Sequence, residues 1–262
     1  MLFSYYERPG LHWSRQQTVT FVDKLREVAT LSFGLTSPDL LPQYQCLVYD
    51  GLNDKIIVVA SDPSGHLLGF LSSVLLPIPG LQHPVIHMGL MCARPEALSH
   101  GLTQRLTSRL LRGYLTNHVD ALLGLRKIWF TNTACVCRTL GAIALELDMV
   151  YPSPQFPPSN GPPSKTHVLI AETIATSDTL RRALYIPPSS EYDKTTSVFR
   201  GSVPGTIFMK EKEDERYHHR DPEITKFYQE LMNWENGDEV LQVGMLSVWA
   251  LVAHWKKTLA KL

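Results

Sequence analysis

The chain has 262 residues, 44% of them hydrophobic, which is enough to bury the core of one large domain or of a domain with an appendage. Lys+Arg and Asp+Glu each number 25, so no net field favours nucleic acid or an anionic membrane. The N-terminus lacks the pattern of a secretory signal, and apolar runs such as residues 69–79 are far shorter than a bilayer span. We therefore expect a cytoplasmic protein with no transmembrane segment and no nucleic-acid partner.

Four cysteines are too few and too irregularly spaced to form a disulfide framework in a chain of this length. Cys135 and Cys137 form a C-x-C pair, but neither a second pair nor a matching His-x₃-His accompanies it. Structural zinc sites need such partners to complete four ligands. The sequence therefore predicts reduced thiols and no metal site.

The first half of the chain predicts a helix, a hairpin and a further strand. Apolar residues recur at helical spacing over residues 16–33. Residues 55–60 and 66–76 are apolar runs that flank the turn sequence Asp-Pro-Ser-Gly at 62–65, which is typical of a β-hairpin. After a Pro- and Gly-rich break, residues 85–92 form another apolar run and predict a strand.

The middle of the chain predicts alternating helices and strands. An amphipathic helix is predicted over residues 103–115 and a second helix over 134–147. Short apolar runs at 127–131 and 167–171 predict strands. Between the last two elements, residues 151–164 contain six prolines and predict a loop or lid.

Beyond residue 171, helices are predicted over residues 178–184, 222–234 and 244–259. The terminal helix, residues 248–262, fits either of two roles: a dimerisation or membrane-surface element, or a helix that packs its Trp face on the domain. The predicted fold is α/β, with a mixed, mostly antiparallel central sheet flanked by helices and a C-terminal helical extension. We expect a ligand-binding domain over residues 1–175 and an extension over 176–262 that packs on the same domain.

The segment from 84 to 111 predicts an anion site. An apolar strand passes through Ala93-Arg94-Pro95 into a polar loop, and Gly101 then opens the amphipathic helix. Such a junction brings unpaired helix N–H groups to the end of a sheet, where a phosphate can bind. Gly101 also leaves room for the backbone to approach the ligand closely.

This order of hairpin, strand, loop and helix resembles the Gcn5-related N-acetyltransferase (GNAT) superfamily, and the chain resembles a divergent member. In that family the strand ends in V-x-P and the loop reads R/Q-x-x-G-x-G/A. Here Ala93-Arg94-Pro95 is followed at the same spacing by Leu-Ser-His-Gly-Leu-Thr at residues 98–103. Leu98 stands where Arg or Gln is expected, and Thr103 replaces a small residue, so the loop loses one side-chain brace.

The resemblance implies acetyl-CoA or another acyl-CoA as cofactor, or an acyl carrier protein as donor. It also implies that backbone groups at a bulge in the strand hold the pantetheine arm and the thioester carbonyl, and that the loop holds the pyrophosphate. The residues at the bulge and in the loop are Gly89, Leu90, Met91 and Cys92, and Ser99, His100, Gly101, Leu102 and Thr103.

A second family region, a strand followed by an Asn and a helix, resembles residues 127–141 in outline. Asn132 is shifted by one position and is expected near the pantetheine. The family's Tyr, which protonates the departing thiolate, is missing, and Cys137 stands one turn into the helix. Two interpretations stay open for Cys137: a catalytic acid, since a thiol pKa of about 8.5 suits that role, or a small buried core thiol.

His87 is the candidate general base. Strand alternation places it on one face with Gly89 and Met91, so it could reach a substrate if the acyl group lies on that face. The alternative is a hydrogen-bonded, half-buried histidine.

The functional hypothesis is an enzyme of the GNAT type that moves an acyl group from acyl-CoA to an amine or hydroxyl of a small molecule. A homodimer is compatible with the sequence. The alternative is a GNAT-fold protein that has lost acyl transfer and catalyses another reaction in the same cleft, such as decarboxylation or cyclisation, or acts as a binding module. Leu98, Thr103 and the missing Tyr favour this alternative.

Overall fold

The computed structural model describes residues 1–246, and of residues 98–100 the backbone only. By its internal contacts the chain forms two compact units. Unit 1 contains Met1–Leu76 and His87–Leu122, and unit 2 contains Pro77–Ile86 and the chain from Leu123 onward. The predicted division at residue 175 stays a prediction.

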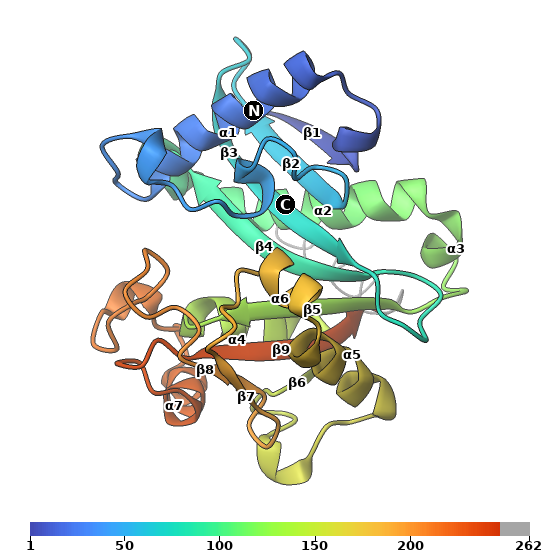
Figure 1. Ribbon diagram of the computed structural model, residues 1–262, viewed down its shortest axis with the longest axis vertical. Coiled ribbons are helices and arrows are strands. Elements are labelled where there is room, and N and C mark those ends of the chain that lie inside the picture. The colour runs from blue at the N-terminus through green and yellow to red at the C-terminus, as the bar shows by residue number, and fades with distance from the viewer. Residues whose placement is uncertain (247–262) are drawn as a thin grey trace. The chain divides into compact units, whose positions relative to one another are not determined.

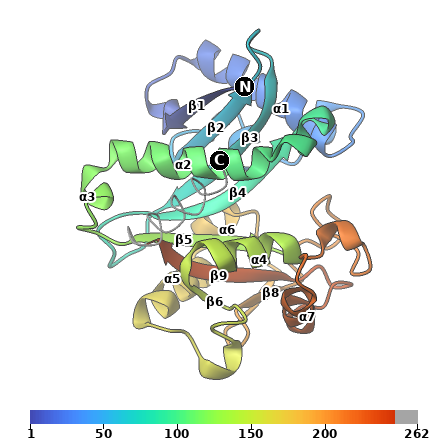
Figure 2. The ribbon, with the colours of Figure 1, turned by 180° about the vertical axis from the view of Figure 1, so that it is seen from behind.

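Unit 1 is a four-stranded sheet with a long helix on each face (Figures 1 and 2). Its strands lie in the order β1-β2-β3-β4, and the β1–β2 and β2–β3 pairs are antiparallel. The elements are β1 (Leu2–Glu7), α1 (Arg15–Ser32), β2 (Lys55–Ser61), β3 (Leu67–Leu76), β4 (Val85–Ala93, whose first two residues belong to unit 2), α2 (Leu102–Asn117) and α3 (Val119–Leu122), with 3₁₀ turns η1 (Pro9–Leu11), η2 (Pro38–Leu40), η3 (Gln45–Leu47) and η4 (Pro95–His100).

Alternation along β1 explains how both helices are held. Tyr6 contacts the rings of Trp13 and Phe21 edge-on, with centroids 5.1 and 5.3 Å apart, and so faces α1. Phe3 points to the opposite face, where the guanidinium groups of α2 lie over its ring. The sheet is therefore covered on both sides, which accounts for the burial of almost every residue of β2.

Unit 2 is built around β9, which pairs antiparallel with β5, β6 and β8, while β7 pairs with β8 at the edge. Figure 1 shows this sheet in green, gold and red. The elements are β5 (Ile128–Ala134), α4 (Cys137–Glu146), β6 (Asp148–Tyr151), η5 (Pro158–Asn160), α5 (Lys165–Thr176), α6 (Asp178–Ala183), β7 (Glu191–Asp193), β8 (Val198–Arg200), η6 (Glu215–Tyr217), α7 (Pro222–Leu231) and β9 (Glu239–Leu246).

The predicted mostly antiparallel sheet with flanking helices is confirmed, and most predicted elements lie within a few residues of their expected bounds. The strand predicted at 167–171 is wrong, because these residues form part of α5. A five-residue apolar run does not distinguish a strand from a buried helix turn. β1 was not predicted at all.

The helical character predicted for the C-terminal extension is only partly right. α6 and α7 are helices, but β7 and β8 lie between them and β9 follows α7. The helix predicted from residue 244 fails at its start, since Gly244 lies in β9. Its remainder, including residues 248–262, lies outside the described residues. Across residues 1–246, no helix has both the length and the apolar content to cross a bilayer.

Candidate functional site

The middle of β4 contacts a glutamine from a distant loop. The backbone N–H of Leu90 donates to Oε1 of Gln45 at 3.0 Å. A Cβ built on Gly89 would lie only 2.0 Å from Nε2 of the same side chain, so glycine is what allows the amide to lie against the strand. Nε2 in turn donates to the hydroxyl of Tyr44 at 2.6 Å.

The loop that carries Gln45 is fastened from α1. Arg26, itself buried, donates to the carbonyl of Pro38 at 2.6 Å and to that of Leu47 at 3.0 Å. Gln45 is 5% exposed and has φ of +47°, a left-handed conformation that is costly for residues with a Cβ. Tertiary packing therefore holds this side chain over β4 against a local backbone preference.

The end of β4 is fixed by Arg94. Its backbone N–H donates to the carbonyl of Leu68 at 2.8 Å and its Nε to that of Leu67 at 2.6 Å. Its guanidinium also pairs with Glu27 of α1. These bonds join the start of β3, the end of β4 and the middle of α1, and so determine where the loop η4 begins.

Gly101 connects η4 to α2 in a left-handed conformation, with φ of +61° and ψ of +28°. The first bond that closes the helix runs from the N–H of Arg105 to the carbonyl of Gly101, and no side-chain bond is made by the cap residue. A Cβ at Gly101 would meet nothing within 4 Å, and Thr103 is exposed. At Gly101 and Thr103 the start of the helix is thus exposed.

The charge of α2 favours an anion. Over Leu102–Asn117 the helix contains three arginines and no acidic residue, in a chain whose formal net charge is zero. Arg105 and Arg109 place their guanidinium carbons 5.1 and 5.3 Å from the Phe3 ring centroid. These charges add to the partial positive charge of the helix N-terminus.

His87 lies inside unit 1 with 1% of its surface exposed. Burial, together with the nearby charge of Lys55, lowers the pKa of its imidazole to about 3. The ring is therefore neutral at pH 7, as a base must be, but an imidazole whose conjugate acid has so low a pKa is a weak proton acceptor.

The other predicted strand residues are also largely buried. Leu90 is 7% and Cys92 1% exposed, while Gly89 and Met91 are half-buried. Burial raises the pKa of the Cys92 thiol. Backbone groups, rather than these side chains, are what this part of β4 offers a ligand.

Asn132 and Cys137 belong to unit 2. Asn132 is buried and donates from Nδ2 to Oε1 of Gln242 at 3.3 Å. Cys137 is enclosed by an apolar cluster that includes Leu140 and Tyr228. Burial raises the pKa of its thiol to about 12, and the role of Cys137 as an acid stays a prediction.

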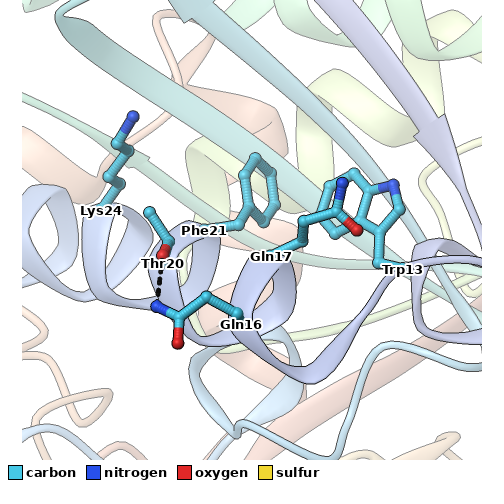
Figure 3. Close-up of a pocket in the computed structure, with 6 residues that line it drawn as sticks. All are labelled: Trp13, Gln16, Gln17, Thr20, Phe21 and Lys24. Carbon is cyan, nitrogen blue, oxygen red and sulfur yellow. Dashed lines mark hydrogen bonds between the residues drawn. The ribbon is translucent and has the colours of Figure 1, made fainter.

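A hollow of about 380 Å³ lies along α1, and none of the residues predicted from the sequence lines it (Figure 3). Trp13 and Phe21 form its apolar part, and their rings are in edge-on contact with centroids 4.9 Å apart. Gln16, Gln17, Thr20 and Lys24 supply the polar lining. The lining contains no carboxylate, histidine or cysteine, so it offers surface for binding but no acid–base pair.

Within residues 1–246 no three His, Cys, Asp or Glu side chains are grouped so as to hold a metal ion. Gln45 and Arg26 are the residues that sequence reasoning missed. The only signal was indirect: Gly89 in an otherwise bulky strand indicates that something approaches closely there. Nothing in the sequence says that the approaching group is an amide 44 positions upstream.

No family model matches the sequence, and the search of curated proteins finds no match. Solved structures do match. An acyl-CoA N-acyltransferase from Pseudomonas aeruginosa is 15% identical over 57% of this chain and 90% of its own, with a TM-score of 0.38. The aminoglycoside acetyltransferase meta-AAC0020 from an uncultured soil metagenomic sample, in complex with sisomicin, is 13% identical over 44% and 70%, with a TM-score of 0.34.

The aminoglycoside N-acetyltransferase AAC(6')-Iy in complex with CoA is 13% identical over 45% of this chain and 70% of its own, with a TM-score of 0.30. All three are described as acyltransferases or acetyltransferases. At such TM-scores the likeness by itself assigns neither activity nor substrate.

Proposed function

We propose that this chain is a divergent GNAT-type protein that transfers an acyl group from acyl-CoA to an amine or hydroxyl of a small molecule. The observation that carries the proposal is the junction of β4, η4 and α2, where Gly101 adopts a left-handed conformation and opens an uncapped helix start. A pyrophosphate can accept hydrogen bonds from successive N–H groups in such a place.

In this proposal the backbone of residues 99–103 holds the pyrophosphate, and the arginines of α2 raise the local positive potential. The backbone at Gly89, Leu90, Met91 and Cys92 holds the pantetheine arm and the thioester carbonyl. Since His87 is buried, it would take the proton of the acceptor through a water chain rather than by direct contact. Cys137 is kept as the candidate acid.

A second candidate function is a GNAT-fold protein that has lost acyl transfer. The enclosure of both candidate acid–base groups, His87 and Cys137, favours it. Binding of acetyl-CoA without any transfer to a panel of small amines and alcohols would support this candidate, whereas turnover with any of them would exclude it.

The proposed donor site is tested by calorimetric titration of acetyl-CoA into two alanine variants. Gly101→Ala and Gly65→Ala each place a Cβ on a residue of positive φ, at +61° and +88°, with nothing within 4 Å. Both should lower stability by roughly 1–2 kcal/mol, because left-handed backbone disfavours a Cβ.

Only Gly101→Ala should weaken acetyl-CoA binding, by about tenfold, the worth of one bond to a charged group. Gly65 lies in the β2–β3 turn and serves as the matched control. Equal affinities in wild type and both variants, or no binding by the wild type up to millimolar acetyl-CoA, would overturn the proposal.

A further inference from the structure

The N–H of Leu90 donates to a side chain that belongs to the same unit. Its acceptor, Gln45 Oε1, is an sp² carbonyl oxygen at 3.0 Å, held in a planar carboxamide at the end of a flexible stem. A thioester carbonyl presents the same kind of acceptor on a similarly small planar group. The two groups therefore compete for one donor.

The carboxamide of Gln45 also fills the space beside Gly89. Nε2, Oε1 and Cδ of Gln45 lie 2.0, 2.2 and 2.5 Å from where a Gly89 Cβ would be, so the whole carboxamide lies against the strand at this residue. Any acyl group bound to the N–H of Leu90 on this face needs that volume. Competition is thus steric as well as for the hydrogen bond.

Gln45 is also poised to leave. It has φ of +47°, a conformation that stores local strain, while its loop stays fastened through Arg26 to the carbonyls of Pro38 and Leu47. Rotation about the side-chain bonds of Gln45 would free Leu90 without unfolding the loop, because the three atoms nearest to Gly89 are the terminal atoms of this side chain.

We infer that the carboxamide of Gln45 is an internal occupant of the acyl position on β4, which an acyl group must displace and which free CoA can leave in place. The inference rests on the proposed function and deepens it. Gln45 is then the residue that sets the preference between acyl-CoA and CoA, by holding the N–H of Leu90 until an acyl group takes it.

The test compares the affinities of acetyl-CoA and of CoA for the wild-type protein and for Gln45→Asn by calorimetry. Asparagine tolerates a left-handed backbone but is one methylene shorter, so its amide no longer reaches Leu90. The ratio of acetyl-CoA to CoA affinity should rise about fivefold in Gln45→Asn, the typical worth of one neutral hydrogen bond.

A second readout does not depend on CoA. The Leu90 amide of the wild-type protein should exchange with solvent more slowly than in Gln45→Asn or in Gly89→Ala, whose methyl group expels the carboxamide. Tyr44→Phe, which removes only the hydroxyl that Gln45 donates to, is the matched control and should keep most of the protection.

The outcomes separate the two proposals. If both ligands bind both proteins and the affinity ratio does not change, Gln45 does not occupy the acyl position and the inference is overturned, while the proposed donor site stands. If neither ligand binds either protein, the proposed function fails and the inference fails with it. Equal exchange of the Leu90 amide in all variants would also overturn the inference.

Discussion

The ionisation of His87 should make the folded protein less stable at acid pH. Burial and the charge of Lys55 lower its folded-state pKa to about 3, whereas the unfolded chain has the ordinary value of 6.5. Between these values the unfolded state takes up a proton and the folded state does not. Stability that is present above the unfolded pKa is therefore lost as the pH falls toward about 3.

The loss of unfolding free energy near pH 5 depends on how far this pH lies below the pKa of the unfolded state. This pH lies about 1.5 units below 6.5, and each unit corresponds to about 1.4 kcal/mol, so His87 should cost the wild-type protein roughly 2 kcal/mol relative to neutral pH. His87→Gln has no titrating group at this position and should escape that part of the loss.

The assay is urea unfolding of wild type and His87→Gln at about pH 7.5 and about pH 5, with the difference between the two pH values compared across the proteins. His66→Gln, in the exposed turn between β2 and β3, is the control and should behave as wild type. If the two pH-dependent losses were equal in wild type and His87→Gln, His87 would titrate as in water. It would then be accessible and a stronger base than proposed.

Three further outcomes follow from buried contacts. Burial raises the pKa of Glu239 from 4.5 to about 7, although the hydrogen bond that Ser202 donates to its carboxylate acts in the opposite direction, so stability present below about pH 4.5 is lost as the pH rises through about 7. Relative to wild type, Glu239→Gln should gain up to roughly 3 kcal/mol of unfolding free energy between about pH 4.5 and about pH 8. Parallel pH profiles of unfolding for the two proteins would refute this. Gly113→Ala would place a Cβ 2.3 Å from the ring of Tyr5 and should lower the free energy of unfolding in urea by about 1–3 kcal/mol. An unchanged urea midpoint would mean that α2 moves freely on β1. Cys137→Ser should lower stability by about 1–2 kcal/mol, because a hydroxyl replaces a thiol in an apolar cluster. If the folded variant also loses turnover by about 10²-fold at saturating acetyl-CoA, Cys137 is the acid.

The sequence predicts α1, β2 and β3 of unit 1 well because their patterns are long, whereas β1, with 6 residues, is not predicted. The 18 residues of α1 show helical spacing, and β2 and β3 flank the turn sequence at residues 62–65, which marks them as a hairpin. It fails where runs are short or apolar throughout: α5 reads as a strand over residues 167–171, and β9 reads as the start of a helix at Gly244. Tertiary pairing decides such segments.

The site was only half predictable for a related reason. Gly101 and the N-terminus of α2 are consecutive in the sequence, so their geometry follows from local signals. The contact between Gln45 and Leu90 joins residues 45 positions apart through a 3₁₀ turn in strained backbone, and no periodicity encodes such a contact. The same holds for the burial of His87, which decides its basicity.

These two unpredicted features share one face of β4. Alternation places His87 and Gly89 on the same side, about 6.6 Å apart along the strand, and the carboxamide of Gln45 covers Gly89. Displacing Gln45 would therefore uncover this face at Gly89, next to His87 along the strand, and we expect water to enter there.

We expect the pKa of His87 to rise from about 3 toward 6.5 in Gln45→Asn, because desolvation is the largest cause of its depression. Titration of the imidazole resonances by NMR measures this directly. An imidazole that still resists protonation below pH 5 in the variant would show that other elements keep His87 dry. Release of the acyl position would then leave the candidate base as weak as before, and the proton of the acceptor would have to leave by another route.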